Sequence, residues 1–178
     1  GRGGLVEIAR AMKVPGGRAE CPVLVGDDAL SFDGSAVPVT VDGRSFLAES
    51  QVFFQSNRFA LPPLIRFVTA HVLGPRVMDL YSGVGVFSAF LEEKGFSVVA
   101  VERDPRCLAL SRKYLAMTSF FTGAVERWGR GRHPAADTVV VDRPRTGLDD
   151  SAPGVVSSCG PRRIIYVSYY SATSARAV

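Results

Sequence analysis

One stretch, residues 77–87, constrains the fold of this chain more than any other. It reads Val-Met-Asp-Leu-Tyr-Ser-Gly-Val-Gly-Val-Phe, which is an apolar strand with an acid, a turn with two glycines, and the start of an apolar helix. Gly83 and Gly85 can take backbone angles closed to other residues and let a ligand approach the main chain. The pattern predicts a nucleotide-type ligand site at the carboxyl edge of a parallel sheet, although a plain tight turn uses the same residues.

Two further signals narrow the class of ligand. A dinucleotide fingerprint has a third glycine where this chain has Ser88, which argues against a bound pyrophosphate and favours a smaller adenosine-type ligand. Acids end three successive predicted strands, at Asp79, Glu102 and Asp142. Glu102 follows Gly83 by nineteen residues, the spacing at which a carboxylate can accept both ribose hydroxyls of an adenosine. We therefore favour S-adenosylmethionine over a nicotinamide cofactor; the alternative is that the acids are merely solvent-facing strand ends.

From residue 51 onward the sequence alternates between helical and strand patterns. Apolar spacing and turn residues predict helices at 61–72, 86–95 and 104–115, and strands at 77–80, 97–101, 120–121, 138–141 and 164–167. Repeated strand-helix units predict an α/β fold with a Rossmann-like, doubly wound parallel sheet. The passage from residue 117 to 120 is short for a helix-to-strand connection, and the sequence leaves open whether residues are missing there.

The first 50 residues follow a different pattern. Short β-like runs at 23–25, 37–41 and 45–47 are separated by turn residues, with hairpin chemistry at Asp33-Gly34 and Asp42-Gly43. So few strands would be marginal alone. We therefore interpret residues 1–50 as a small antiparallel β region that is part of another domain, and residues 51–178 as the α/β domain.

Composition sets the broad class. The 178 residues are 47% hydrophobic and 21% charged, which allows a substantial core, and the formal net charge of +4 mildly favours an anionic partner without naming one. Three widely separated cysteines form no C-x-x-C pair, so neither a disulfide framework nor a metal site is indicated. No apolar run approaches the length of a membrane span. We expect a cytoplasmic monomer without metal or membrane attachment.

Five motifs in order resemble those of the RNA uracil-5 methyltransferases. They are Phe-Phe-Gln-Ser-Asn at 53–57, the glycine-turn motif at 79–87, Val-Glu at 101–102, Asp-Arg-Pro-Arg-Thr-Gly at 142–147, and Tyr-Val-Ser at 166–168 with Ala-Thr and Ala-Arg at 172–176. The resemblance runs from about residue 26 to the end. It implies a class I methyltransferase domain at 51–178 that lacks its C-terminal end, part of the family's central β domain at 1–50, S-adenosylmethionine as cofactor, and tRNA or rRNA as substrate.

The resemblance also assigns roles to residues. It implies that Gln55, Tyr81, Glu102 and Asp142 contact S-adenosylmethionine, together with Asp79, Gly83, Gly85 and Val86 of the glycine-turn motif, and that Arg145 lies in the active-site loop. Ala124 stands where the family has a polar contact to adenine. The family's catalytic base, a glutamate, would lie beyond Val178, and its N-terminal RNA-binding TRAM domain has no counterpart, so we interpret the chain as a fragment.

One departure affects the chemistry directly, because Tyr169 occupies the position of the family's nucleophilic cysteine. Uracil C5 becomes nucleophilic only after a group adds at C6, and a largely protonated phenol is a poor substitute for a thiolate. Cys159 precedes the strand at 164–167, so we predict a buried thiol at the amino edge of the sheet, some 15 Å from the site at about 3.3 Å per residue.

Aromatic and basic side chains leave further interpretations open. Tyr169 and Tyr170 could stack a flipped base while Arg143 and Arg145 bind phosphate, or they could simply pack at the sheet end and face solvent. The bases that surround Trp128 are more typical of a solvated loop than of an RNA patch; they are Arg127, Arg130, Arg132 and His133.

Three functions remain open from the sequence. The first is uracil-C5 methylation of tRNA or rRNA. The second is an inactive relative that binds S-adenosylmethionine and RNA. The third is methylation of a different atom, with Asp142 and Tyr169 orienting a lone pair and no covalent adduct.

Overall fold

The computed structural model describes residues 24–25, 30–31, 35–49, 52, 54, 60–130, 134–142 and 152–167. The chain divides into two compact units, Gly1–Leu64 and Ile65–Val178. The predicted domain boundary at residue 50 stays a prediction, because most residues between 50 and 59 lie outside the described part.

Two antiparallel hairpins make up the described strands of the first unit. Strand β1 (Leu24–Val25) pairs with β2 (Leu30–Ser31), and β3 (Val37–Val41) pairs with β4 (Arg44–Ala48). Asp42 and Gly43 form the two-residue turn of the second hairpin, with φ of 47° and 81°, which is the combination a type I′ turn requires. This confirms the predicted antiparallel β region, whereas the Asp33-Gly34 turn lies outside the described residues.

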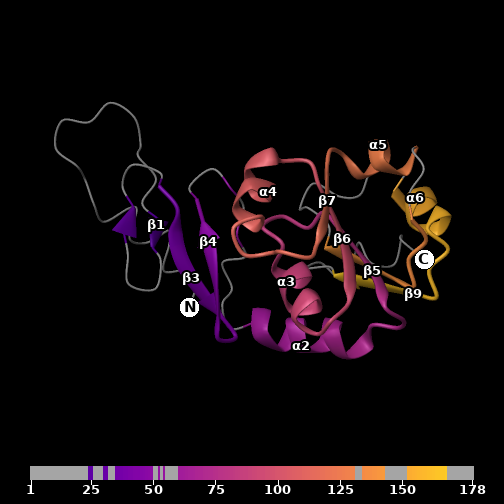
Figure 1. Ribbon diagram of the computed structural model, residues 1–178, viewed down its shortest axis with the longest axis horizontal. Coiled ribbons are helices and arrows are strands. Elements are labelled where there is room, and N and C mark those ends of the chain that lie inside the picture. Colours follow the sequence, from indigo (N-terminus) through magenta and orange to yellow (C-terminus); the bar gives the residue numbers. More distant parts are fainter. Residues whose placement is uncertain are drawn as a thin grey trace. The chain divides into compact units, whose positions relative to one another are not determined.

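A parallel five-stranded sheet organises the second unit, with strand order β7-β6-β5-β8-β9 (Figure 1). The strands are β5 (Arg76–Leu80), β6 (Ser97–Glu102), β7 (Ser119–Thr122), β8 (Thr138–Asp142) and β9 (Arg163–Val167). The helices are α2 (Leu61–His71), α3 (Val86–Glu93), α4 (Pro105–Ser111), α5 (Val125–Gly129) and α6 (Ala152–Ser158). The chain moves outward from β5 to β7 and then returns to β8 on the other side of β5, so the strand order reverses between β5 and β8. This confirms the predicted α/β, Rossmann-like doubly wound fold.

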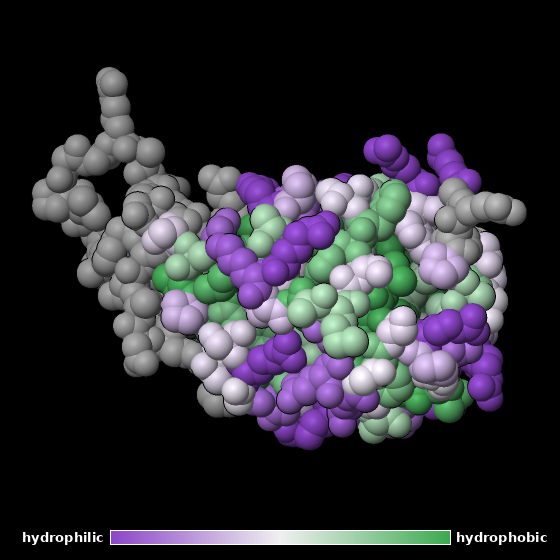
Figure 2. All heavy atoms as spheres, viewed as in Figure 1, coloured by the Kyte–Doolittle hydropathy of each residue, from purple (hydrophilic) through white to green (hydrophobic). Residues whose placement is uncertain are grey.

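Helices cover both faces of the sheet (Figure 1). On one face the core cluster joins apolar side chains of the central strands to α5 and α6; its members include Met78, Leu80, Val101, Val139, Val141, Val125, Trp128, Val155 and Val156. Helix α3 contacts β5 and β6, and α4 contacts β6 and β7. Because side chains alternate along a strand, Val77 and Asp79 face away from this cluster, toward α3. Figure 2 shows hydrophilic residues (purple) over much of one surface, with hydrophobic residues (green) between them.

Three expectations about the helices were wrong or incomplete. Helix α4 ends at Ser111, not at residue 115, and residues 112–118 form the connection to β7, so the fold needs no extra residues there. Glu92 holds this connection, because its carboxylate accepts hydrogen bonds from the backbone N–H of Ala116 and Thr118. Helices α5 and α6 were not predicted, since α5 spans only five residues and α6 contains Pro and Gly.

Within the described ranges, no helix is long and apolar enough to cross a membrane. The same ranges hold no group of three or more His, Cys, Asp or Glu side chains arranged to bind a metal ion.

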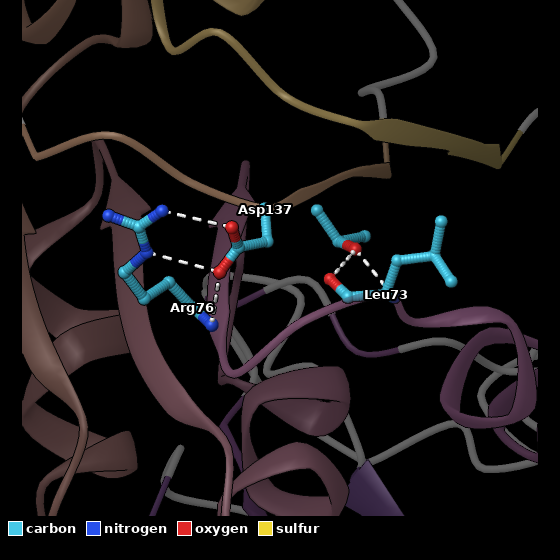
Figure 3. Close-up of polar contacts among 4 residues, drawn as sticks. Leu73, Arg76 and Asp137 are labelled. Atoms are coloured by element: carbon cyan, nitrogen blue, oxygen red, sulfur yellow. Dashed lines mark hydrogen bonds and ion pairs between the residues drawn. The ribbon is translucent and has the colours of Figure 1, made fainter.

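An ion pair closes the amino edge of the sheet (Figure 3). The Arg76 guanidinium donates to both carboxylate oxygens of Asp137, at 2.9 and 3.1 Å, and the Arg76 backbone N–H donates to the same carboxylate at 3.1 Å. These bonds lower the pKa of Asp137 to about 2. A side chain at Gly74 would clash, since its Cβ would lie 2.5 Å from that of Asp137. Beside the pair, the Thr138 hydroxyl bonds the N–H and the C=O of Leu73.

We expect the Arg76–Asp137 pair to stabilise the fold only above acidic pH. The pKa of an aspartate in an unfolded chain is about 3.9, whereas Asp137 in the folded protein has a pKa of about 2. The stabilisation is therefore present above about pH 4 and is lost as the pH falls toward about 2. Asp137→Asn should lower the free energy of unfolding at neutral pH and flatten its decline across this range, measured by urea unfolding at a series of pH values.

Arg76→Gln is the matched variant for this test, because it removes the cation and leaves the acid in place. It should flatten the same part of the pH profile. If Asp137→Asn keeps the full decline in the free energy of unfolding at acidic pH, another acid causes that decline.

Candidate functional site

The three predicted acids meet at the carboxyl edge of the central strands. Leu80 of β5 pairs with Val101 of β6 and with Val141 of β8, so Glu102 and Asp142 lie just beyond this level on either side of β5. Burial is the largest cause that raises the pKa of Asp79, and the charges of Asp142 and Glu102 raise it further. Parallel strands bring their carboxyl ends to one edge, which is why residues distant in sequence come together here. This edge includes the reversal between β5 and β8, where doubly wound folds bind ligands.

Asp79 supports this edge from inside the protein. Its side chain is fully buried, and Oδ2 accepts hydrogen bonds from the Ser88 backbone N–H at 3.1 Å and the Ser88 hydroxyl at 2.6 Å. The other oxygen, Oδ1, is buried and has no hydrogen-bond partner among the described residues. Burial raises the pKa of Asp79 to about 7, although the Ser88 bonds oppose this shift. Ser88 therefore replaces the third glycine with a residue that binds the strand to α3.

The two glycines of the turn meet different demands. Both have positive φ, 55° at Gly83 and 76° at Gly85, so both occupy backbone conformations that favour glycine. A Cβ at Gly85 would lie 2.9 Å from the Leu115 side chain and 3.3 Å from the Ser111 hydroxyl, so packing against the end of α4 excludes larger residues. A Cβ at Gly83 would meet nothing within 4 Å. Gly83 thus provides an open main-chain surface, whereas Gly85 permits close packing.

Glu102 links the glycine turn to the start of α4. Its Oε2 accepts from the Gly83 N–H at 2.9 Å, and its Oε1 accepts from the Asp104 N–H at 2.8 Å. Asp104 in turn caps α4 by accepting from the Arg106 N–H. An ionised carboxylate offers about four acceptor positions, so each Glu102 oxygen retains capacity for one more hydrogen bond. The carboxylate is consequently fixed in position and still able to accept from a ligand.

The remaining described candidates surround the turn. Tyr81 follows β5 with a φ of 60° and donates its hydroxyl hydrogen to Glu126 on α5 at 3.1 Å. Val86 is the first residue of α3. Asp142 ends β8, and burial raises its pKa to about 6. Glu126 is the residue that sequence analysis missed, because a lone glutamate on a five-residue helix gives no recognisable motif.

Other predicted residues lie outside the described part of the chain. They are Gln55, Arg145 and Tyr169, together with Arg143, Tyr170, Arg132 and His133. Ala124 directly precedes α5. Arg127 and Arg130 are exposed, as predicted for the basic residues around Trp128, but Arg127 lies on α5 and not in a loop. Trp128 itself lies in the core cluster.

Cys159 lies in the core, as predicted. Its side chain is 1% exposed, and its sulfur contacts the Val155 carbonyl oxygen at 3.2 Å and the Met78 sulfur at 3.8 Å. The Cys159 carbonyl accepts from the N–H of Ala136, just before β8 begins, which places it at the amino edge of the sheet. Burial raises the pKa of Cys159, and burial is also the main cause that raises the pKa of Cys107 to about 12. Both sites disfavour a thiolate.

Comparison with known proteins identifies the family. A 23S rRNA (uracil(747)-C(5))-methyltransferase of Pyrococcus abyssi is 35% identical over 150 residues, which cover 76% of this chain. A tRNA (uracil(54)-C(5))-methyltransferase of Pyrococcus furiosus is 30% identical over 158 residues, which cover 85% of the chain. The chain belongs to the RNA uracil-C5 methyltransferase family. No protein-family model matches it.

A solved methyltransferase structure supports the same assignment. The tRNA (uracil-54, C5)-methyltransferase of Pyrococcus abyssi, crystallised with S-adenosyl-L-homocysteine, superposes with a TM-score of 0.71 at 27% identity and covers 84% of this chain. The chain covers 38% of that structure and 36–37% of the two methyltransferases compared above, so it spans just over a third of their length.

We expect Cys107 and Cys159 to resist thiol reagents in the folded protein, because both are buried and both disfavour the thiolate. Cys21 lies outside the described residues and is replaced by Ser in every sample. Mass spectrometry after iodoacetamide treatment should find both thiols unmodified in buffer and modified in guanidinium chloride.

Ser97→Cys is the control, since Ser97 is exposed at the start of β6 and its thiol should react readily. Rapid labelling of Cys159 in the folded protein would contradict this placement and make it available as a nucleophile.

Proposed function

We propose that this chain is part of an S-adenosylmethionine-dependent RNA methyltransferase of the uracil-C5 type, and that the carboxyl edge around Gly83 and Glu102 binds the cofactor. One observation carries the proposal: the Glu102 carboxylate is held by the Gly83 and Asp104 N–H groups beside the reversal in strand order. The relative that was solved with S-adenosyl-L-homocysteine, the demethylated cofactor, supports the same ligand.

The residues present fit an adenosine-type ligand. Glu102 retains two acceptor positions for the ribose hydroxyls, and Gly83 leaves room for a ligand against the main chain. Asp79 acts from behind the turn by holding α3 through Ser88. By resemblance to the family, Tyr81, Val86 and Asp142 complete the site, whereas Gln55, which the resemblance also implicates, lies outside the described residues. When bound, S-adenosylmethionine supplies an electrophilic methyl group on its sulfonium sulfur.

RNA is the substrate class that the relatives indicate. The two methyltransferases compared above act on uracil in 23S rRNA and in tRNA, and both are similarly related to this chain, so the choice between them stays open. The net charge of +4 is modest for an RNA-binding surface. RNA affinity of this chain should therefore be weak and fall steeply with salt, because phosphate contacts release counterions.

The position of the family's nucleophile is where this chain departs from the uracil-C5 methyltransferases. Tyr169 replaces the cysteine implied by the family resemblance, and the buried Cys159 lies at the opposite edge of the sheet. We therefore propose that the chain binds the cofactor without forming an adduct at uracil C6. Two functions are compatible with a cofactor site that has Tyr169 at the nucleophile position. The chain could bind S-adenosylmethionine and RNA without catalysis, or it could methylate an atom other than uracil C5.

Cofactor binding is tested by calorimetry with S-adenosyl-L-homocysteine. The unaltered chain should bind, and Glu102→Ala should weaken binding by about 10- to 100-fold, since charge-assisted hydrogen bonds contribute roughly 1–3 kcal/mol. Because Glu102 also holds the glycine turn, thermal unfolding is measured alongside.

Glu93→Ala is the matched control, since this exposed glutamate ends α3, away from the glycine turn. Its affinity should equal that of the unaltered chain. Absence of binding by the unaltered chain, or an equal effect of the two substitutions, would refute the site.

The chemistry is tested with an RNA oligonucleotide that carries 5-fluorouracil at the target position, because fluorine at C5 blocks the proton removal that would release an adduct. We expect no covalent complex with the unaltered chain on a denaturing gel. Tyr169→Cys should restore part of the trapping.

Trapping by the unaltered chain would overturn the view that the nucleophile is lost. Cys159→Ser then decides whether that buried thiol is the attacking group.

A further inference from the structure

Tyr81 faces the opposite side of the sheet from the one that strand alternation predicts. Met78 and Leu80 belong to the core cluster under α5 and α6, whereas Asp79 points toward Ser88 of α3. Tyr81 should follow Asp79, since side chains alternate along a strand. Instead it takes a left-handed φ of 60° and packs against the core cluster. A non-glycine residue keeps this conformation only when its surroundings compensate for the strain.

Glu126 provides a specific contact that compensates for the strain. Its Oε1 accepts the Tyr81 hydroxyl hydrogen at 3.1 Å, across 45 residues of sequence. Glu126 lies in the first turn of α5, and its neighbours Val125 and Trp128 anchor that helix in the core cluster. The glutamate therefore sits on a fixed support, and its hydrogen bond holds the tyrosine ring on the α5 side.

Two carboxylates thus hold the segment that leads into the glycine turn. Glu102 of β6 holds Gly83 through its N–H, and Glu126 of α5 holds Tyr81 through its hydroxyl. Between them, the Ser82 N–H donates to the Val101 carbonyl at 3.1 Å. Three successive residues are therefore fixed by partners on two different elements, which sets the orientation of the open main chain at Gly83.

We propose that Glu126 is a positioning residue of the cofactor site, which acts through Tyr81 to hold the glycine turn in its ligand-binding conformation. This inference rests on the proposed function, because it assigns Glu126 to the same site. Packing alone does not require the contact, since a phenylalanine would fill the same volume without the hydroxyl. Tyrosine differs from phenylalanine only by this hydroxyl group, and the hydroxyl is the group that donates a hydrogen bond to Glu126.

A double-mutant cycle with S-adenosyl-L-homocysteine as the probe tests this role. Glu126→Ala should weaken binding by about 5- to 10-fold, the equivalent of one lost hydrogen bond. Glu126→Gln keeps an acceptor oxygen and should bind within about 2-fold of the unaltered chain. Arg127→Ala, an exposed neighbour on the same helix, should leave affinity unchanged. In a Tyr81→Phe background, Glu126→Ala should have almost no further effect, because the hydroxyl through which it acts is gone.

Amide hydrogen exchange at Gly83 gives a second readout without ligand. Exchange of the Gly83 N–H should be faster in Glu126→Ala and in Tyr81→Phe than in Arg127→Ala. Unchanged affinity of Glu126→Ala in a protein that binds the probe would overturn the positioning role and leave the proposed function intact. An effect of the same size in the Tyr81→Phe background would also overturn it, since Glu126 would then act without Tyr81. No binding by the unaltered chain would overturn both.

Discussion

A buried carboxyl group holds together the carboxyl edge of the sheet around the glycine turn. Asp79 lies within the central strand, fully buried, and its hydrogen bonds to Ser88 connect β5 to the first turn of α3. Burying a carboxyl group is costly unless it is hydrogen bonded or protonated, and its raised pKa reflects that cost. The glycine turn lies between these two bonded residues, so its path depends on them. The strand, turn and helix therefore behave as one unit.

The acids around this unit have separate tasks. Asp79 supports the turn from behind, Glu102 holds Gly83 and retains acceptor capacity, and Glu126 holds Tyr81 from the opposite face. Asp142 ends the strand on the other side of the reversal, where burial raises its pKa. Negatively charged carboxylates this close together would normally repel one another. Here Asp79, Glu102 and Glu126 each accept hydrogen bonds from N–H or O–H groups, which lets these carboxylates lie around one turn.

The fold and the chemistry of this chain are separable. The chain belongs to a family of RNA uracil-C5 methyltransferases, and its sheet retains the strand order and the glycine turn that a cofactor requires. The position that the family resemblance assigns to the nucleophile holds Tyr169, and the one described thiol near that region of sequence, Cys159, packs between Met78 and Val155. Similarity in fold therefore does not by itself carry over the family's chemistry to this chain, because the residue at that position differs.

The sequence by itself determined the doubly wound sheet, the antiparallel β region, and the meeting of Asp79, Glu102 and Asp142. Hydrophobic periodicity and turn residues are local signals, and parallel strands bring their carboxyl ends to one edge. The family was also readable from five short motifs. Only the tertiary structure decided the role of Ser88, the left-handed Tyr81 and its bond to Glu126, the burial of Trp128, and the existence of α5 and α6. Short helices carry little periodicity, and contacts between residues 45 positions apart form only when the sheet is assembled.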